Sequence, residues 1–92
     1  MINYLYSNMK IIAYVSSLCP TSKKMEDVIN SLSIQTEIYD IDRVDNVLID
    51  AFHIKNTPTI LLLNKNGEEL WRFVGYVSKK DLEYKIKKFN HD

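Results

Sequence analysis

The chain has 92 residues, of which 46% are hydrophobic and 26% are charged, so its length and composition fit one globular domain and not two. Twelve Lys and Arg residues balance twelve Asp and Glu residues, and this zero net charge argues against nucleic acid or a charged membrane surface as a partner. A single cysteine, Cys19, excludes an internal disulfide, and two histidines leave few metal ligands, so we expect no bound metal.

The first half of the chain has the pattern strand, helix, strand. The β-branched run Lys10–Val15 predicts a buried strand. Pro20 suits a first helical position, and the apolar spacing predicts a helix from about Pro20 to Ser31. Thr36–Ile41 alternates and predicts a second strand, parallel to the first because a helix connects them. The apolar face of this helix consists of Met25, Val28, Ile29 and Leu32.

The second half begins with a helical stripe over Val44–Phe52, which Asn56-Thr57-Pro58 breaks. Thr59–Leu63 is apolar on both faces and predicts a central strand. An Asn-Gly turn at Asn66-Gly67 predicts a hairpin leading into the strand Glu69–Val74, in which we interpret Trp71 as a packing residue.

The last helix is predicted after Gly75, which ends the preceding strand and is a candidate for a bulge. Ser78 suits the N-cap, and Leu82, Ile86 and Phe89 share one helical face. The whole order is β-α-β-α-β-β-α. It predicts an α/β fold in which a compact mixed sheet is flanked by helices, in one domain over residues 1–92.

Cys19 lies between a predicted strand and the start of a predicted helix. Unpaired backbone N–H groups and the positive end of the helix dipole favour a thiolate there. Helix N-termini can lower a cysteine pKa from about 8.5 to roughly 3.5–7.5, and Lys23 and Lys24 would add to this effect. The alternative, a small buried apolar side chain, stays open from position alone.

The segment Cys19–Met25 (CPTSKKM) resembles the Cys-x-x-Cys-Lys-x-Met segment of the thioredoxin-like superfamily. The resemblance extends from about Lys10 to Phe89 and implies a thioredoxin-like fold. Four further segments match family landmarks: Asp40-Ile41-Asp42 at the end of the second strand, Ile54–Leu63 as the Ile-Pro-Thr strand, Asn64–Glu68 as the hairpin, and Phe73–Leu82 as the passage into the last helix.

The resemblance implies a role for each matching residue. Cys19 corresponds to the attacking cysteine, and Pro58 to the proline that follows a cis peptide bond and faces that cysteine. Thr57 would offer its backbone to an extended partner, and Gly75 would keep the approach open. With Pro20, these residues are the expected substrate-binding set.

Three residues depart from the family pattern. Ser22 replaces the resolving cysteine, so an internal disulfide cannot form. Ala13 replaces the buried aspartate that relays protons, and Leu18 replaces the tryptophan before the attacking cysteine. The expected activity is therefore thiol–disulfide exchange through Cys19 and a mixed disulfide, with Ser22 hydrogen-bonding the thiolate. An external thiol such as glutathione would complete the cycle, and no bound cofactor is expected.

The expected partner is a protein disulfide or an extended peptide. Leu18 does not fit a signal-peptide cleavage site, and no apolar stretch is long enough to span a bilayer. We therefore expect a cytoplasmic monomer with neither a membrane nor a nucleic-acid partner.

Three alternatives remain at this stage. The domain could be a redox-inactive adaptor that binds peptides in the Thr57-Pro58 groove. It could resemble glutaredoxins and bind glutathione or an iron–sulfur cluster, although Pro20-Thr21 is not the Gly-Phe of that family. Ser22 could also be an introduced replacement of a native cysteine, which the genomic codon would decide.

Overall fold

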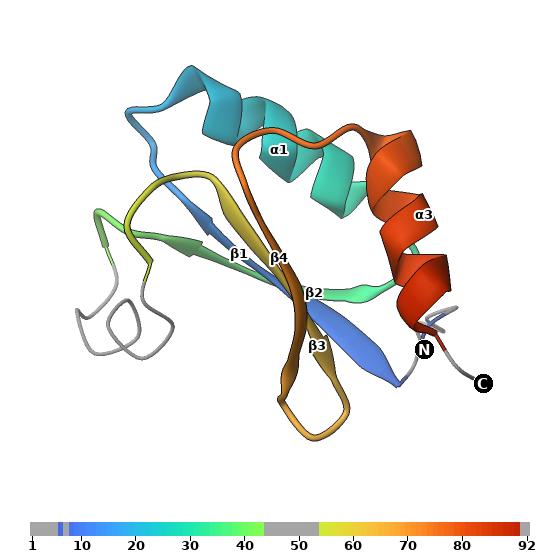
Figure 1. Ribbon diagram of the computed structural model, residues 1–92. Helices are drawn as coiled ribbons and strands as arrows, with labels where there is room; N and C mark the ends of the chain where they lie inside the picture. Colours follow the sequence, from blue (N-terminus) through green and yellow to red (C-terminus); the bar gives the residue numbers. More distant parts are fainter. Residues whose placement is uncertain (1–5, 7, 44–53, 91–92) are drawn as a thin grey trace, which may run out of the picture.

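The computed structural model describes residues 6, 8–43 and 54–90. These form a mixed sheet of four strands in the order β2-β1-β3-β4, with helices α1 and α3 on one side of it (Figure 1). The predicted helix over Val44–Phe52 lies outside the described residues. The strands are β1 (Met9–Val15), β2 (Gln35–Asp40), β3 (Thr59–Asn64) and β4 (Glu69–Val74), and the helices are α1 (Pro20–Asn30) and α3 (Lys79–Phe89).

The pairing of the strands confirms the predicted topology. β1 and β2 are parallel, with Ile12 opposite Glu37. β3 runs antiparallel to both β1 and β4, so β1 and β3 are the central strands. β1 begins one residue earlier than predicted because Met9 pairs with Asn64. β2 is likewise shifted by one residue, since Gln35 pairs with Lys10.

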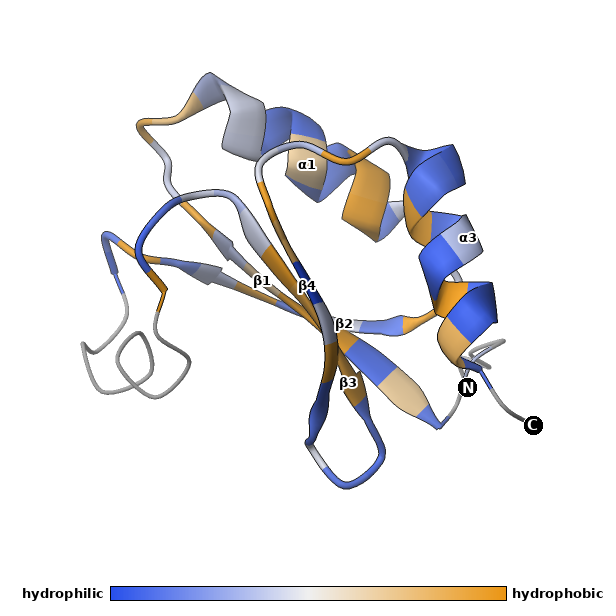
Figure 2. Cartoon of the chain, in the orientation of Figure 1, coloured by the Kyte–Doolittle hydropathy of each residue, from blue (hydrophilic) through white to orange (hydrophobic). Residues whose placement is uncertain are grey.

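One core lies between the sheet and the two helices. Its residues are fully or almost fully buried, and both helices alternate between hydrophobic and hydrophilic residues along their length (Figure 2). Burial of this apolar surface is the main term that holds the helices on the sheet. The core includes Ile11 and Ala13 of β1, Met25 and Ile29 of α1, Ile60 and Leu62 of β3, and Leu82 and Ile86 of α3.

The opposite face of the sheet carries a second, smaller cluster, formed by Ile12, Tyr14, Leu61 and Leu63. The Tyr14 ring stacks on Tyr39 of β2 with a centroid distance of 5.7 Å. On the same pair of strands, Lys10 Nζ lies 2.7 Å from Glu37 Oε2, and the Tyr39 hydroxyl donates to Glu37 Oε1. The alternation of side chains along β1 thus supplies both clusters.

Side-chain hydrogen bonds hold the hairpin between β3 and β4. In the hairpin, Asn64 Oδ1 accepts hydrogen bonds from the backbone N–H groups of Asn66 and Glu68, and Gly67 takes a positive φ of 83°. The register shift in this hairpin occurs at Leu62/Leu63, not at Gly75 as the sequence suggested.

The helix ends also agree with their sequence signals. The Ser78 hydroxyl caps α3 by accepting a hydrogen bond from the Asp81 N–H, as predicted. α1 ends one residue earlier than predicted, with Ser31 as its C-cap. In the described ranges, neither helix is both long and apolar enough to cross a bilayer.

Candidate functional site

Cys19 occupies the N-cap position of α1, in extended backbone conformation, as the sequence predicted. It is half-buried, and its Sγ is the single thiol of the chain. A turn closed by a hydrogen bond from the Cys19 N–H to the Ser16 carbonyl leads into it. The sulfur therefore lies where the first N–H groups of a helix have no partner within the helix.

Ser22 lies one turn further along α1 and is 1% exposed. Its hydroxyl oxygen accepts a hydrogen bond from the Ser16 backbone N–H at 3.1 Å. Its own N–H donates to the Cys19 carbonyl at 3.0 Å. Through these two hydrogen bonds, Ser22 ties the turn before Cys19 to the first turn of α1. The hydroxyl can still donate a hydrogen bond of its own.

The pKa of Cys19 is held below the ordinary value of a thiol. The largest cause is hydrogen bonding from the Ser22 backbone, followed by the Ser22 hydroxyl, with a smaller contribution from Thr21. The causes that lower this pKa are hydrogen bonds, and Lys23 and Lys24 are not among them. Lys23 instead reaches Asp27, with 3.9 Å between Nζ and Oδ1.

Thr57 and Pro58 face Cys19 from the loop before β3. The bond between them is cis, which confirms the expectation from the resemblance. Cys19 Sγ lies 3.9 Å from the carbonyl oxygen of Thr57, within reach of the weak S–H donor. Two hydrogen bonds fix this loop: Thr59 Oγ1 donates to the Asn56 carbonyl at 2.5 Å, and the Gly75 N–H donates to the Pro58 carbonyl at 2.8 Å.

Gly75 therefore lies beside the Thr57-Pro58 loop. Its φ of 105° is a conformation that side chains rarely adopt. A Cβ built at this position would meet only the Phe73 ring, at 3.8 Å, so the space in front of it is open. The structure thus brings Cys19, Ser22, Thr57, Pro58 and Gly75 to one end of the sheet.

The two remaining departures from the family pattern differ in environment. Ala13 is completely buried in the apolar core beneath the helices, where it offers no group that could carry a proton. Leu18 is 85% exposed and Pro20 is also exposed. Leu18 and Pro20 thus place two apolar side chains on the surface directly beside Cys19.

Sequence reasoning missed the contribution of Asp42 to the site. Its Oδ2 accepts hydrogen bonds from Ser16 Oγ at 2.9 Å and Ser17 Oγ at 3.3 Å, and Ser16 Oγ in turn accepts the Leu18 N–H. The sequence could have indicated this contact, because Ser16 and Asp42 follow two parallel strands and the carboxyl ends of such strands meet at the same edge of a sheet. Asp42 therefore orders the loop that presents Cys19.

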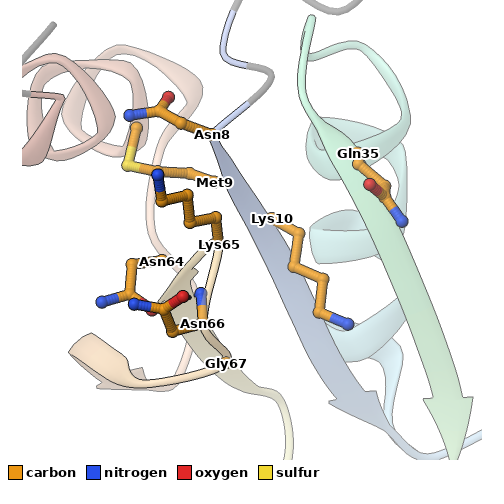
Figure 3. A pocket seen from close by; sticks show the side chains of 8 residues that line it. All are labelled: Asn8, Met9, Lys10, Gln35, Asn64, Lys65, Asn66 and Gly67. Atoms are coloured by element: carbon orange, nitrogen blue, oxygen red, sulfur yellow. Dashed lines mark hydrogen bonds between the residues drawn. The ribbon is translucent and has the colours of Figure 1, made fainter.

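The other end of β1 carries a polar pocket of about 420 Å³ (Figure 3). It contains none of the residues predicted for the site, and its Lys10 is paired with Glu37. In the part of the chain that the structure describes, no group of three or more His, Cys, Asp and Glu residues could hold a metal ion. The pocket is lined by Asn8, Met9, Lys10, Gln35, Asn64, Lys65, Asn66 and Gly67.

Comparisons with known proteins agree on the fold. The family model described as "Thioredoxin-like domain" matches residues 6–90. Thioredoxin-2, described as a component of malaria parasite protein secretion machinery, is 25% identical, with a TM-score of 0.79 over 88% of this chain and 82% of that one. A thioredoxin of Nicotiana alata, NaTrxh, is 26% identical, with a TM-score of 0.76 over 97% and 79%.

A third solved structure, described as a malarial protein, is 26% identical, with a TM-score of 0.78 over 89% of this chain and 97% of that one. No curated protein matches the sequence. The family model thus matches almost the whole chain.

Proposed function

Because the chain belongs to the thioredoxin-like domain family, we propose that it exchanges thiols and disulfides through Cys19 alone. The observation that carries this proposal is the position of Cys19 at the N-cap of α1, 3.9 Å from the Thr57 carbonyl oxygen, where hydrogen bonds from Ser22 lower the pKa of the thiol. A lower pKa increases the fraction of thiolate at neutral pH, and the thiolate is the species that attacks disulfides. The proposed setting is the cytoplasm, with the domain acting as a monomer.

The first step is attack of the Cys19 thiolate on one sulfur of a substrate disulfide. A new S–S bond forms to Cys19, and the second substrate sulfur leaves as a thiolate and takes a proton from water. Oxidation of Cys19 is thus balanced by reduction of the departing sulfur. Ser22 assists by hydrogen bonding to the Cys19 thiolate.

The substrate would approach along the backbone of Thr57. Thr57 is half-buried, in a loop that hydrogen bonds from Thr59 and Gly75 hold in place. An extended segment can hydrogen-bond such a backbone much as it would add to a sheet edge. Pro20 and Gly75 border the approach and leave it open to a polypeptide.

The second step requires a thiol that the chain does not contain. Serine cannot form an S–S bond, so Ser22 leaves the mixed disulfide in place. We propose that an external thiol such as glutathione attacks it: the glutathione sulfur bonds to the substrate sulfur, and Cys19 departs as a thiolate. The chain itself would then need no bound cofactor.

Intact-mass measurement tests this proposal. Reduced protein incubated with bis(2-hydroxyethyl) disulfide should gain one adduct on Cys19, and Cys19→Ala should gain none. The rate at pH 6 should be higher for folded protein than for protein unfolded in urea, because only the fold lowers the pKa. Equal rates in the two states would contradict the proposal.

A redox-inactive peptide adaptor is the second candidate. It is supported by the apolar surroundings of Ala13 and by the replacement of the second thiol by Ser22. In that case an extended peptide should bind near Thr57 without any covalent adduct. Absence of an adduct from the folded protein under all conditions would favour this function over the first.

A further inference from the structure

The large apolar side chains that the described residues expose gather in two places. One is Leu18, directly before Cys19. The others lie on β4, on the segment after it and on α3: Phe73, Val74, Tyr76 and Tyr84. Single exposed apolar residues are ordinary, whereas several that border one groove are typical of a binding surface.

Most of this second group borders a groove of about 570 Å³ between β4 and α3. This volume is in the range of sites that bind organic ligands, roughly 300–1,000 Å³. The rings of Trp71 and Phe73 form one wall with centroids 5.9 Å apart, and Lys85 Nζ lies 5.8 Å from the Trp71 ring. Tyr76, Val77 and Tyr84 complete the apolar lining.

Trp71 therefore does more than the packing predicted from the sequence. It contacts the core beneath the helices and also lines the groove. The two charged residues of the groove, Asp81 and Lys85, have opposite signs and balance. A neutral aromatic groove favours an apolar occupant over a charged one.

The groove lies next in sequence to Gly75, which a short series of contacts connects to Cys19. Gly75 donates its N–H to Pro58, and the neighbouring Thr57 carbonyl is 3.9 Å from Cys19 Sγ. Tyr76 and Val77 follow Gly75 directly, and the Val77 N–H lies 3.4 Å from Met25 Sδ in α1. Figure 1 shows this segment running from β4 past α1 to the start of α3.

β4 is also an edge strand of the described sheet. A row of backbone groups on such an edge can hydrogen-bond an extended chain. A polypeptide that is bound at Cys19 and passes Gly75 would thus reach the groove with its backbone still supported.

We infer that the groove binds a large apolar side chain of the polypeptide whose disulfide Cys19 attacks. This inference rests on the proposed function and names its substrate class: disulfides in proteins, flanked by an aromatic or aliphatic residue. The chemical step is unchanged. The Cys19 sulfur bonds to one substrate sulfur and the other leaves as a thiolate, while the flanking side chain stays between Phe73 and Tyr84.

Matched peptides test the inference. Each carries one cysteine as a mixed disulfide with 2-mercaptoethanol and has either Phe or Ser two, four or six residues away on either side. The rate of adduct formation should be about tenfold higher for the best Phe peptide than for its Ser partner, roughly what half-burying a large apolar side chain is worth. Phe73→Ser and Tyr84→Ser should remove this preference, and both should leave the rate with bis(2-hydroxyethyl) disulfide unchanged.

Lys88→Ser, on an exposed position of α3 outside the groove, is the control and should keep the preference. Tyr84 is 65% exposed, so its replacement should not disturb folding. Equal rates for Phe and Ser peptides would overturn the inference while leaving the proposed function intact. A dimer that Tyr84→Ser dissociates, with no peptide preference, would also overturn it and assign the groove to a second copy. Absence of adducts with every disulfide would remove the proposed function, and this inference with it.

Discussion

Cys19 Sγ and the carbonyl oxygen of Thr57 lie 3.9 Å apart, although 38 positions of sequence separate the two residues. The sheet accounts for this proximity. Tyr14, at the end of β1, pairs with Thr59, at the start of β3. The loop that follows β1 and the loop that precedes β3 must therefore meet at the same end of the sheet, and each brings one half of the site.

The pKa of Cys19 should be measurable as the midpoint of its alkylation rate against pH. We expect a midpoint below the free value of about 8.5, because hydrogen bonds from Ser22 and Thr21 stabilise the thiolate. Ser22→Ala removes the hydroxyl and keeps the backbone N–H, so it should raise the midpoint only part of the way to the free value. Lys23→Ala should leave it unchanged. A wild-type midpoint at or above 8.5 would refute this account of the site.

Replacing Ser22 with cysteine should change the stoichiometry of the reaction with disulfides. The new thiol can attack the mixed disulfide on Cys19, so each chain should release two thiolates from bis(2-hydroxyethyl) disulfide and lose its adduct. Ser22→Ala is the matched control and should release one and keep its adduct. Thiol titration counts the released thiolates, and intact mass detects the adduct. A persistent adduct on Ser22→Cys would show that position 22 is poorly placed for resolution.

Core packing between the sheet and the helices should dominate stability. Leu62 lies on the central strand β3 and is completely buried. Leu62→Ala should therefore lower the free energy of unfolding by about 3 kcal/mol. Leu18→Ala removes the same atoms from a site that is 85% exposed and should change it by less than about 0.5 kcal/mol. Urea unfolding compares the two, and similar losses would contradict the assignment of the core.

Glu37 should make stability depend on acid pH. The hydrogen bond from Lys10, followed by that from Tyr39, lowers its pKa in the folded state. A carboxylate with a lowered pKa stabilises the fold above its unfolded pKa of about 4.3, and this contribution is lost as the pH falls through the folded value. Glu37→Gln should therefore be less stable than wild type at pH 7, by about 0.5 kcal/mol for such a partly exposed pair.

The stability difference between wild type and Glu37→Gln should disappear at pH 2. Lys10→Met removes the other partner of this ion pair and should likewise lose its charge-dependent difference from wild type at pH 2. Urea unfolding at both pH values measures all three proteins. A difference that persists at pH 2 would mean that altered packing, and not the charge of Glu37, explains the lower stability of Glu37→Gln.

Much of the fold was predictable because local signals and the global architecture agree. The apolar run of Thr59–Leu63 predicted a central strand, and Ser78 predicted the cap of α3; both are found. The ends of β1 and β2 were less predictable. They depend on pairing with Asn64 and Lys10 across the sheet, which no local pattern contains.

The candidate site was predictable where single residue types are diagnostic. Cys19 before a helix and the cis bond before Pro58 were both expected from short motifs. The contacts of Asp42 with Ser16 and Ser17 were not, because they join residues 25 and 26 positions apart. The aromatic groove escaped notice for a similar reason: Trp71 and Tyr84 come from different elements and meet only in three dimensions.

Counting turnovers tests the central claim most directly, namely that one thiol carries out the exchange. Reduced protein with excess bis(2-hydroxyethyl) disulfide should release one thiolate per chain and then stop, with all of Cys19 bound in a mixed disulfide. Adding glutathione should restart release, at a rate above that with Cys19→Ala, in which glutathione reacts only directly with the disulfide. Continued release beyond one equivalent per chain, in the absence of any added thiol, would contradict the claim.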